Sequence, residues 1–230
     1  MDDDAGSGGD GTDERADVAG GDEPDKRASP AAADGADATA DTTVTVRPAR
    51  PDDAAGVREV YAPFVRDSPV TFRTEVPSVE AVADEIRETR AGDEYPWYVA
   101  TIESEDRVVG YAYASRLRDR AAYRWTAETS VYVAPDSHST GIGTRLYDRL
   151  LGTLRRQGYC SAYAAIATPN PQSVAFHEGQ DFERVGTFPK SGFKLGEWHD
   201  VVWYHRRLRD PDGEPAAPDP VSAVEGGRDD

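Results

Sequence analysis

The sequence predicts an α/β (α+β) domain in which helices pack on a mixed sheet. Segments with alternating apolar residues, typical of strands, are interspersed with segments whose apolar residues recur at helical spacing. All 21 aromatic residues lie between residues 42 and 209, and no internal repeat divides this stretch. Its 168 residues are enough for one sizeable hydrophobic core, so we expect a single domain at 42–209.

The first half of this domain begins with a strand and two helices. Residues 43–49 alternate as a strand, and Pro51 opens a helical stretch. Apolar residues at helical spacing predict a second helix at about 78–91. Strands at 97–103 and 107–115 flank a Ser-Glu-Asp turn, which indicates a hairpin.

The second half continues with a strand at 125–134, which alternates cleanly and ends at a proline. A helix at 141–157 carries a stripe of Ile and Leu and is followed by Gly158, a common helix-ending residue. The order of elements is therefore β-α-α-β-β-β-α-β-α-β-β. The last elements are a strand at 159–167, a short helix that begins at Asn170-Pro171, and two strands within 182–208.

The two ends of the chain differ sharply from the domain. Residues 1–41 contain 13 acidic and 3 basic residues, residues 210–230 contain 7 acidic residues and 1 basic residue, and neither segment contains an aromatic residue. A strongly charged segment with little to bury cannot offset the conformational entropy that ordering would cost. We therefore expect disordered acidic tails at 1–41 and 210–230, dispensable for catalysis.

Composition excludes several classes of protein. The net charge of −17 resides almost entirely in the tails, so the domain itself is a poor electrostatic match for nucleic acid. The sequence contains no run of about 18 apolar residues, so it predicts no membrane helix. The acidic start at Met1 does not resemble a secretory signal. Cys160 is the only cysteine and shows no zinc-ligand spacing with the histidines. We expect a cytoplasmic protein without a metal, nucleic-acid or membrane partner.

The first candidate functional motif is Gly141-Ile142-Gly143-Thr144, directly between strand 125–134 and helix 141–157. Glycines at such a turn let backbone N–H groups point toward one place, where the helix dipole favours an anion. A pyrophosphate would suit this site; the alternative is a tight turn without a ligand. No third glycine and no Lys-Ser/Thr follow, so the motif is neither the dinucleotide fingerprint nor a P-loop.

Further motifs run through the whole domain: Thr71-Phe72-x-Thr74-Glu75, Tyr95-Pro96-Trp97, Gly110-Tyr-Ala-Tyr-Ala, Arg120-x-x-Tyr123-x-Trp125-Thr126-x-Glu128-x-Ser130-Val-Tyr-Val133, Pro169-Asn170-x-x-Ser173-Val174, His177-Glu178 and Lys194-x-Gly196-x-Trp198-x-Asp200-Val201. Together with the glycine turn, they resemble the GNAT acetyltransferase superfamily. The closest resemblance is to phosphinothricin and methionine sulfoximine N-acetyltransferases, over essentially all of 43–208. The sequence departs from the superfamily at His138, where glutamine or arginine is usual.

The resemblance implies a GNAT-type fold, with a mixed, mostly antiparallel central sheet flanked by helices. It also implies acetyl-CoA as co-substrate, a small-molecule amine as acceptor, and a homodimer. The residues that it implies for cofactor binding are Val131, Tyr132, Val133, His138, Ser139, Thr140, Gly141, Ile142, Gly143, Thr144 and Asn170.

Two residues are candidates for acid–base catalysis. Glu128 is the only acid on strand 125–134, and the resembled family has an acid there, so we predict that Glu128 deprotonates the amine. The alternative is a solvated glutamate paired with an arginine. His177 takes the place of the superfamily's tyrosine, which serves the departing thiolate, and shares a helix face with the expected N-cap Asn170. For His177 the alternatives are substrate positioning or a satisfied, half-buried histidine.

The acceptor pocket is expected around Arg120, because the family has an arginine there and a guanidinium matches carboxylate or phosphinate groups. Phe72, Tyr123 and Lys194 are implied as pocket walls or further anion contacts, whereas Arg116, Arg118 and Arg124 are expected to be solvated. Trp198 and Trp203 are expected in the core. We thus expect an N-acetyltransferase (an acyltransferase) for a small amino-acid-like acceptor, working by direct transfer in a ternary complex. The alternatives are an enzyme for other small amines or peptide N-termini, and a non-catalytic acyl-CoA sensor.

Overall fold

The computed structural model describes residues 43–138, 140–210 and 213–226. The predicted N-terminal tail at 1–41 and the candidate cofactor residue Ser139 lie outside these ranges. Within the described ranges, the longest helices are too short or too polar to cross a membrane.

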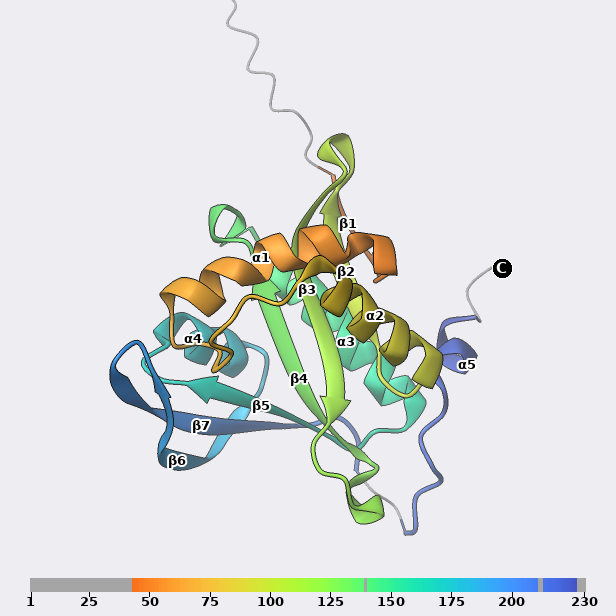
Figure 1. The fold of residues 1–230 in the computed structure, drawn as a ribbon. Coiled ribbons are helices and arrows are strands. Elements are labelled where there is room, and N and C mark those ends of the chain that lie inside the picture. Colours follow the sequence, from red (N-terminus) through yellow and green to blue (C-terminus); the bar gives the residue numbers. More distant parts are fainter. Residues whose placement is uncertain (1–42, 139, 211–212, 227–230) are drawn as a thin grey trace, which may run out of the picture. The chain divides into compact units, whose positions relative to one another are not determined.

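A seven-stranded sheet with the order β1-β2-β3-β4-β5-β7-β6 forms the centre of the fold (Figure 1). Only the β4–β5 pair is parallel, so the expected mixed, mostly antiparallel sheet is confirmed. The alternating apolar residues form the strands at the expected places. Their bounds are β1 Val44–Pro48, β2 Trp97–Ile102, β3 Arg107–Arg116, β4 Thr126–Val133, β5 Ser161–Ala167, β6 Glu183–Lys194 and β7 Glu197–Arg207.

Helices cover both faces of the sheet (Figure 1). Helices α1 (Ala54–Asp67) and α2 (Val79–Gly92) pack on one face, against β3 and β2. Helix α3 (Ile142–Gln157) packs on the other, because its predicted apolar stripe is almost fully buried. Helix α4 (Pro171–Gly179) lies beside α3, where the Tyr147 and Phe176 rings are 5.1 Å apart. Each face therefore encloses its own hydrophobic core.

Two glycines allow the chain to enter and leave α3. Gly141 at its N-cap has φ +78° and Gly158 at its C-cap has φ +101°, both in the left-handed region that residues with a side chain avoid. The Gly158 N–H closes the helix by donating to the carbonyl groups of Leu154 and Arg155.

The C-terminal segment contradicts the prediction of a disordered tail for residues 213–226. It contains the short helix α5 (Val221–Glu225), which contacts α3. The prediction weighed only apolar burial, and this segment is held mainly by polar groups. For example, Trp125 Nε1 donates to the Ala216 carbonyl at 2.7 Å, and Arg149 pairs with Glu225 at 3.0 Å.

Candidate active site

The parallel strands β4 and β5 pair over a short distance and then diverge. Their register runs from Thr126–Ser161 to Glu128–Tyr163, although β4 continues to Val133. The Thr129 hydroxyl donates to the Tyr163 carbonyl at 3.1 Å, at the point where the pairing stops. This point, where the two strands begin to diverge, is here called the vertex. Beyond it, in the described structure, the edge of β4 that includes Val131, Tyr132 and Val133 has no strand beside it on the β5 side. An extended ligand could bond to this backbone.

The glycine turn lies directly after this open edge, at the N-terminus of α3. The N–H groups of Ile142, Gly143 and Thr144 belong to the first helical turn, so they have no acceptor within the helix. The helix dipole also favours an anion at this end. A Cβ atom at Gly143 would lie 3.2 Å from the Phe176 ring and 3.7 Å from Val133. The turn is therefore fitted to a glycine, and its polar N–H groups suit the pyrophosphate of acetyl-CoA.

The side chains before the glycine turn bind the turn itself. His138 Nε2 lies 2.9 Å from the Val133 carbonyl oxygen, so this nitrogen carries the proton and donates. The Thr140 hydroxyl donates to the Ser137 carbonyl at 2.7 Å. Both side chains brace the backbone, which leaves the backbone N–H groups as the main donors for an anion.

Glu128 lies on β4 at the last paired position, half-buried. Burial raises the pKa of its carboxyl group above the usual value, while the nearby Arg118 guanidinium lowers that pKa. A carboxylate with a raised pKa is a better proton acceptor at neutral pH than an ordinary surface glutamate. The environment of Glu128 thus suits the predicted general base.

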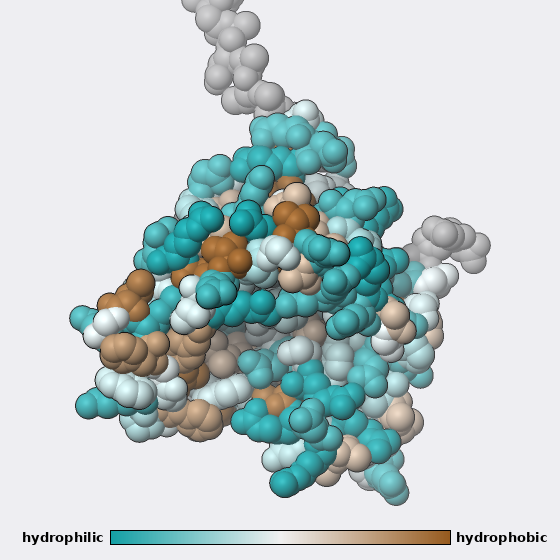
Figure 2. Space-filling model, in the orientation of Figure 1, coloured by the Kyte–Doolittle hydropathy of each residue, from teal (hydrophilic) through white to brown (hydrophobic). Residues whose placement is uncertain are grey.

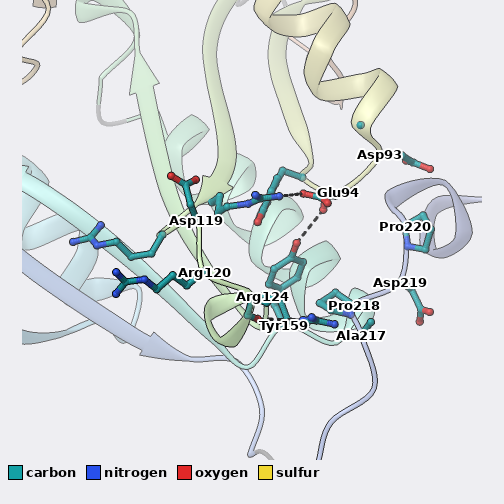
Figure 3. Close-up of a pocket in the computed structure, with 15 residues that line it drawn as sticks. Asp93, Glu94, Asp119, Arg120, Arg124, Tyr159, Ala217, Pro218, Asp219 and Pro220 are labelled. Atoms are coloured by element: carbon teal, nitrogen blue, oxygen red, sulfur yellow. Dashed lines mark hydrogen bonds and ion pairs between the residues drawn. The ribbon is translucent and has the colours of Figure 1, made fainter.

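Arg118 is exposed, as the sequence analysis expected, and it is the arginine whose charge acts on Glu128. Its guanidinium carbon also lies 5.8 Å from the centre of the Trp203 ring. The predicted acceptor residue Arg120 lines a hollow of about 440 Å³, which Arg118 also borders but Glu128 does not. Figure 3 shows the Arg120 side chain extending away from Glu94 and Tyr159 on the opposite wall. Four arginines in one short segment indicated an anion site, but not which of them acts electrostatically on Glu128.

His177 lies in the interior, with 4% of its surface exposed. Its Nδ1 is 2.7 Å from the Ser173 carbonyl oxygen, and its Nε2 is 2.9 Å from the Tyr147 hydroxyl. Because a carbonyl oxygen can only accept, Nδ1 carries the proton and donates to Ser173, and Nε2 accepts from the Tyr147 hydroxyl. Burial lowers the pKa of the His177 ring. This geometry favours the satisfied buried histidine that the sequence left open as an alternative. Asn170 caps the helix as predicted, since its Oδ1 accepts from the Ser173 N–H at 3.1 Å.

The remaining acceptor candidates are dispersed. Lys194 is buried, which lowers its pKa, and its Nζ donates to the carbonyl oxygens of Thr71 at 2.7 Å and Phe64 at 3.3 Å. It therefore braces the loop after α1 instead of offering its charge to an acceptor. Phe72 packs on β6, where a Cβ atom at Gly192 would collide with its ring. Tyr123 is 43% exposed in the loop before β4.

Two further expectations concern tryptophan and metal. Trp198 was expected in the core, but it is 59% exposed on β7, whereas Trp203 is half-buried under Arg118. Among residues 43–138, 140–210 and 213–226, there is no group of three or more His, Cys, Asp or Glu side chains that could hold a metal ion.

Comparison with known proteins agrees with this geometry. Residues 46–203 match the acetyltransferase (GNAT) domain family. The chain is 39% identical over 181 residues to a phosphinothricin N-acetyltransferase of Streptomyces viridochromogenes, covering 79% of this chain and 94% of that protein. It is 32% identical over 166 residues to the L-methionine sulfoximine/L-methionine sulfone acetyltransferase of Pseudomonas aeruginosa, covering 72% and 95%.

A solved structure is similar as well. The phosphinothricin acetyltransferase of Sinorhizobium meliloti in complex with acetyl-CoA superposes with a TM-score of 0.70 at 34% identity, covering 76% of this chain and 94% of that chain. The match of the family model over most of the domain, the identity to curated relatives and the shared fold lead to one conclusion: the chain belongs to the GNAT family of N-acetyltransferases.

Proposed function

We propose that this enzyme acetylates the amino group of a small amino acid that carries a second anionic or tetrahedral head group, of the phosphinothricin or methionine sulfoximine type. The observation that carries the proposal is the half-buried Glu128, whose pKa is raised by burial, together with the exposed Arg118, whose charge acts on it. The named activities of the relatives from Streptomyces and Pseudomonas support the same acceptor class. We place the reaction in the cytoplasm, where acetyl-CoA is available.

Acetyl-CoA supplies the activated acetyl group as a thioester. The backbone N–H groups of Ile142, Gly143 and Thr144 would hold its pyrophosphate, and the open edge of β4 would hold the chain that ends in the thioester. Val131, Tyr132 and Val133 contribute backbone groups to this edge. The Tyr132 ring itself belongs to the core, stacked 5.1 Å from Tyr111.

Glu128 takes a proton from the ammonium group of the acceptor, either directly or through water. The neutral nitrogen then forms a bond to the acetyl carbon while the carbon–sulfur bond breaks, and the nitrogen loses its second proton as the amide forms. The products are the N-acetylated acceptor and CoA, whose thiolate takes up this second proton, while Glu128 releases the first to solvent. We propose that His177 serves this reaction as a positioning residue through Tyr147, because both of its ring nitrogens are already bonded.

Arg118 is the proposed anchor for the acceptor's carboxylate or its second anionic group. A guanidinium can bind either group through two parallel hydrogen bonds. Because Arg118 lies close enough to Glu128 to alter its pKa, an acceptor bound to Arg118 would bring its amino group near the base. Arg120, on the same loop, could bind the second anionic group.

A thiol-trapping assay tests the proposal against its alternatives. The purified protein is mixed with acetyl-CoA, a thiol-reactive dye and a panel of acceptors: phosphinothricin, methionine sulfoximine, ordinary amino acids, simple amines and peptides. Preferential thiol release with the first two supports the proposal. Preferential release with amines or peptides would favour a different acceptor. Calorimetric binding of acetyl-CoA without release for any acceptor would favour the sensor.

We also propose that the enzyme is a homodimer that pairs through the outer surface of β6 and β7. Five apolar side chains there are at least half exposed, and Figure 2 shows apolar surface on this side of the molecule. In a symmetric dimer, each copy would cover the apolar patch of the other and so remove both patches from water. The side chains are Val185, Phe188, Phe193, Leu195 and Trp198.

Sedimentation equilibrium tests the dimer. We expect a wild-type dimer and a monomeric Phe193→Ser/Trp198→Ser double variant, with Tyr123→Ser as the control for loss of an exposed aromatic side chain elsewhere. A wild-type monomer, or a dimer that survives the double substitution, would contradict this interface.

A further inference from the structure

We propose that residues 213–226, here called the C-terminal strap, are a working part of the enzyme that positions the arginine loop. The arginine loop is residues 117–124, which carry Arg118 and Arg120. The inference rests on the proposed function of Arg118 as acceptor anchor. The family model matches residues 46–203 and so does not include the strap.

The far end of the strap is fixed to β2 and α3. The Glu225 carboxylate accepts from the Tyr98 hydroxyl and pairs with Arg149 at 3.0 Å. Burial, followed by the hydrogen bond to Glu225, raises the pKa of Tyr98 to about 12, so the phenol remains a donor. The Arg149 guanidinium also lies 5.5 Å from the centre of the Tyr98 ring. A single strap carboxylate therefore joins two elements of the domain.

The middle of the strap pairs with the end of α3 in both directions. The Asp219 N–H donates to the Gln157 carbonyl at 2.7 Å, and Gln157 Nε2 donates to the Asp219 carbonyl at 2.8 Å. Gln157 is 1% exposed, and the same Nε2 also donates to the Glu94 carbonyl at 2.9 Å. The Glu94 carboxylate in turn pairs with Arg116 at 3.0 Å, immediately before the arginine loop.

The near end of the strap holds the other side of the loop. Trp125 follows the loop directly, and its Nε1 donates to the Ala216 carbonyl at 2.7 Å. The Arg124 guanidinium lies 5.4 Å from the centre of the Trp125 ring. The hollow between the loop and the strap is bordered on one side by Arg120 and Arg124 and on the other by Pro218 and Asp219 (Figure 3).

The arginine loop makes few bonds of its own to the rest of the domain. In the described structure, the hydrogen bonds of residues 117–124 join residues within the loop, such as Tyr123 N–H to the Arg120 carbonyl at 2.9 Å. A segment with only local bonds opens easily unless its flanks are held. The strap holds the flank at Trp125 directly and the flank at Arg116 through Gln157 and Glu94. Loss of the strap should therefore displace Arg118 while leaving the phosphate cradle intact.

The test compares wild-type protein with a chain shortened to residues 1–210 and with the point variant Glu225→Ala. Glu214→Ala is the matched control, because it removes a glutamate from the strap that makes no hydrogen bond or ion pair in the described structure. We expect truncation and Glu225→Ala to raise the acceptor KM about tenfold, the scale on which small misplacements of binding groups act, with acetyl-CoA affinity unchanged. Hydrogen exchange at residues 117–125 should become faster in the shortened chain and in Glu225→Ala.

Each outcome decides the proposal. A lower melting temperature with an unchanged acceptor KM and unchanged hydrogen exchange in the loop would show that the strap only stabilises the fold. Equal losses of affinity for the acceptor and for acetyl-CoA would also overturn the proposal. If the shortened chain does not fold, Glu225→Ala gives the answer. If the wild type acetylates nothing, the proposed function fails, and the exchange rates of the loop still decide whether the strap positions it.

Discussion

The Tyr147 hydroxyl on α3 lies 2.9 Å from Nε2 of His177 on α4, and both side chains are buried. The same hydroxyl is 3.2 Å from the Thr129 hydroxyl, which bonds to the Tyr163 carbonyl where β4 and β5 diverge. The single proton of the Tyr147 hydroxyl is donated to His177, so the contact with Thr129 is a close approach of two oxygens at the vertex of the proposed acetyl-CoA site. His177 can influence catalysis by fixing the Tyr147 hydroxyl at this vertex, without contacting a substrate.

The buried state of His177 predicts a specific pH dependence of stability. Its folded pKa is lowered by burial, so below about pH 6.5 the unfolded chain binds a proton that the folded protein does not. Stability conferred by the neutral ring is thus present above that pH and lost as the pH falls. Thermal melts between pH 7.5 and 5.5 should show a smaller decrease for His177→Gln than for the wild type. The exposed His138→Ala is the control, and identical slopes for all three proteins would refute the buried neutral histidine.

Glu128→Gln should lower kcat by about 10²–10⁴-fold, because it removes a positioned proton acceptor but retains the shape of the side chain. Acetyl-CoA affinity, measured by calorimetry, should not change. The wild-type rate should rise with pH through a pKa above that of an ordinary glutamate, since burial raises it. Glu59→Gln, on the exposed face of α1, is the matched control. Near-full activity of Glu128→Gln across pH 6 to 9 would remove Glu128 from the mechanism.

The two arginines of the loop should differ. Arg118→Leu should raise the acceptor KM about 10- to 100-fold, as expected for loss of a charged anchor, and Arg120→Leu only a few-fold. Arg118 lowers the pKa of Glu128, so its removal should also move the acidic limb of the pH–rate profile to higher pH. Steady-state kinetics of both variants across pH provides the measurement. A larger effect at Arg120, with no change in the profile of Arg118→Leu, would restore the original assignment to Arg120.

The phosphate cradle predicts a contrast between backbone and side chain. Gly143→Val should nearly abolish CoA binding, because the new side chain would collide with Phe176 and obstruct approach to the backbone N–H groups. His138→Ala should weaken binding only a few-fold, since its ring bonds to the Val133 carbonyl. Calorimetric titration with CoA, with folding checked by circular dichroism, compares the two. Equally severe losses in folded proteins would mean that the His138 side chain carries the binding.

The sequence by itself determined the seven strands and helices α1 to α4 and their order, because periods of two and of 3.6 residues are local properties of the chain. It also determined the glycine turn and the Asn170 cap, since positive φ angles and capping hydrogen bonds involve only neighbouring residues. The motif pattern was sufficient to indicate the family. Glu128 could be selected because it is the only acid on its strand.

Tertiary structure decided where the long side chains reach. Lys194 was expected at the acceptor and instead bonds to carbonyl groups more than a hundred residues away, at Phe64 and Thr71. Composition alone placed residues 213–226 in a disordered tail, but the segment is held by partners such as Trp125 and Gln157, whose positions depend on the whole fold. Hydrogen bonds between distant segments leave no periodic trace in a sequence, so only the folded chain shows that Arg118 acts on the base.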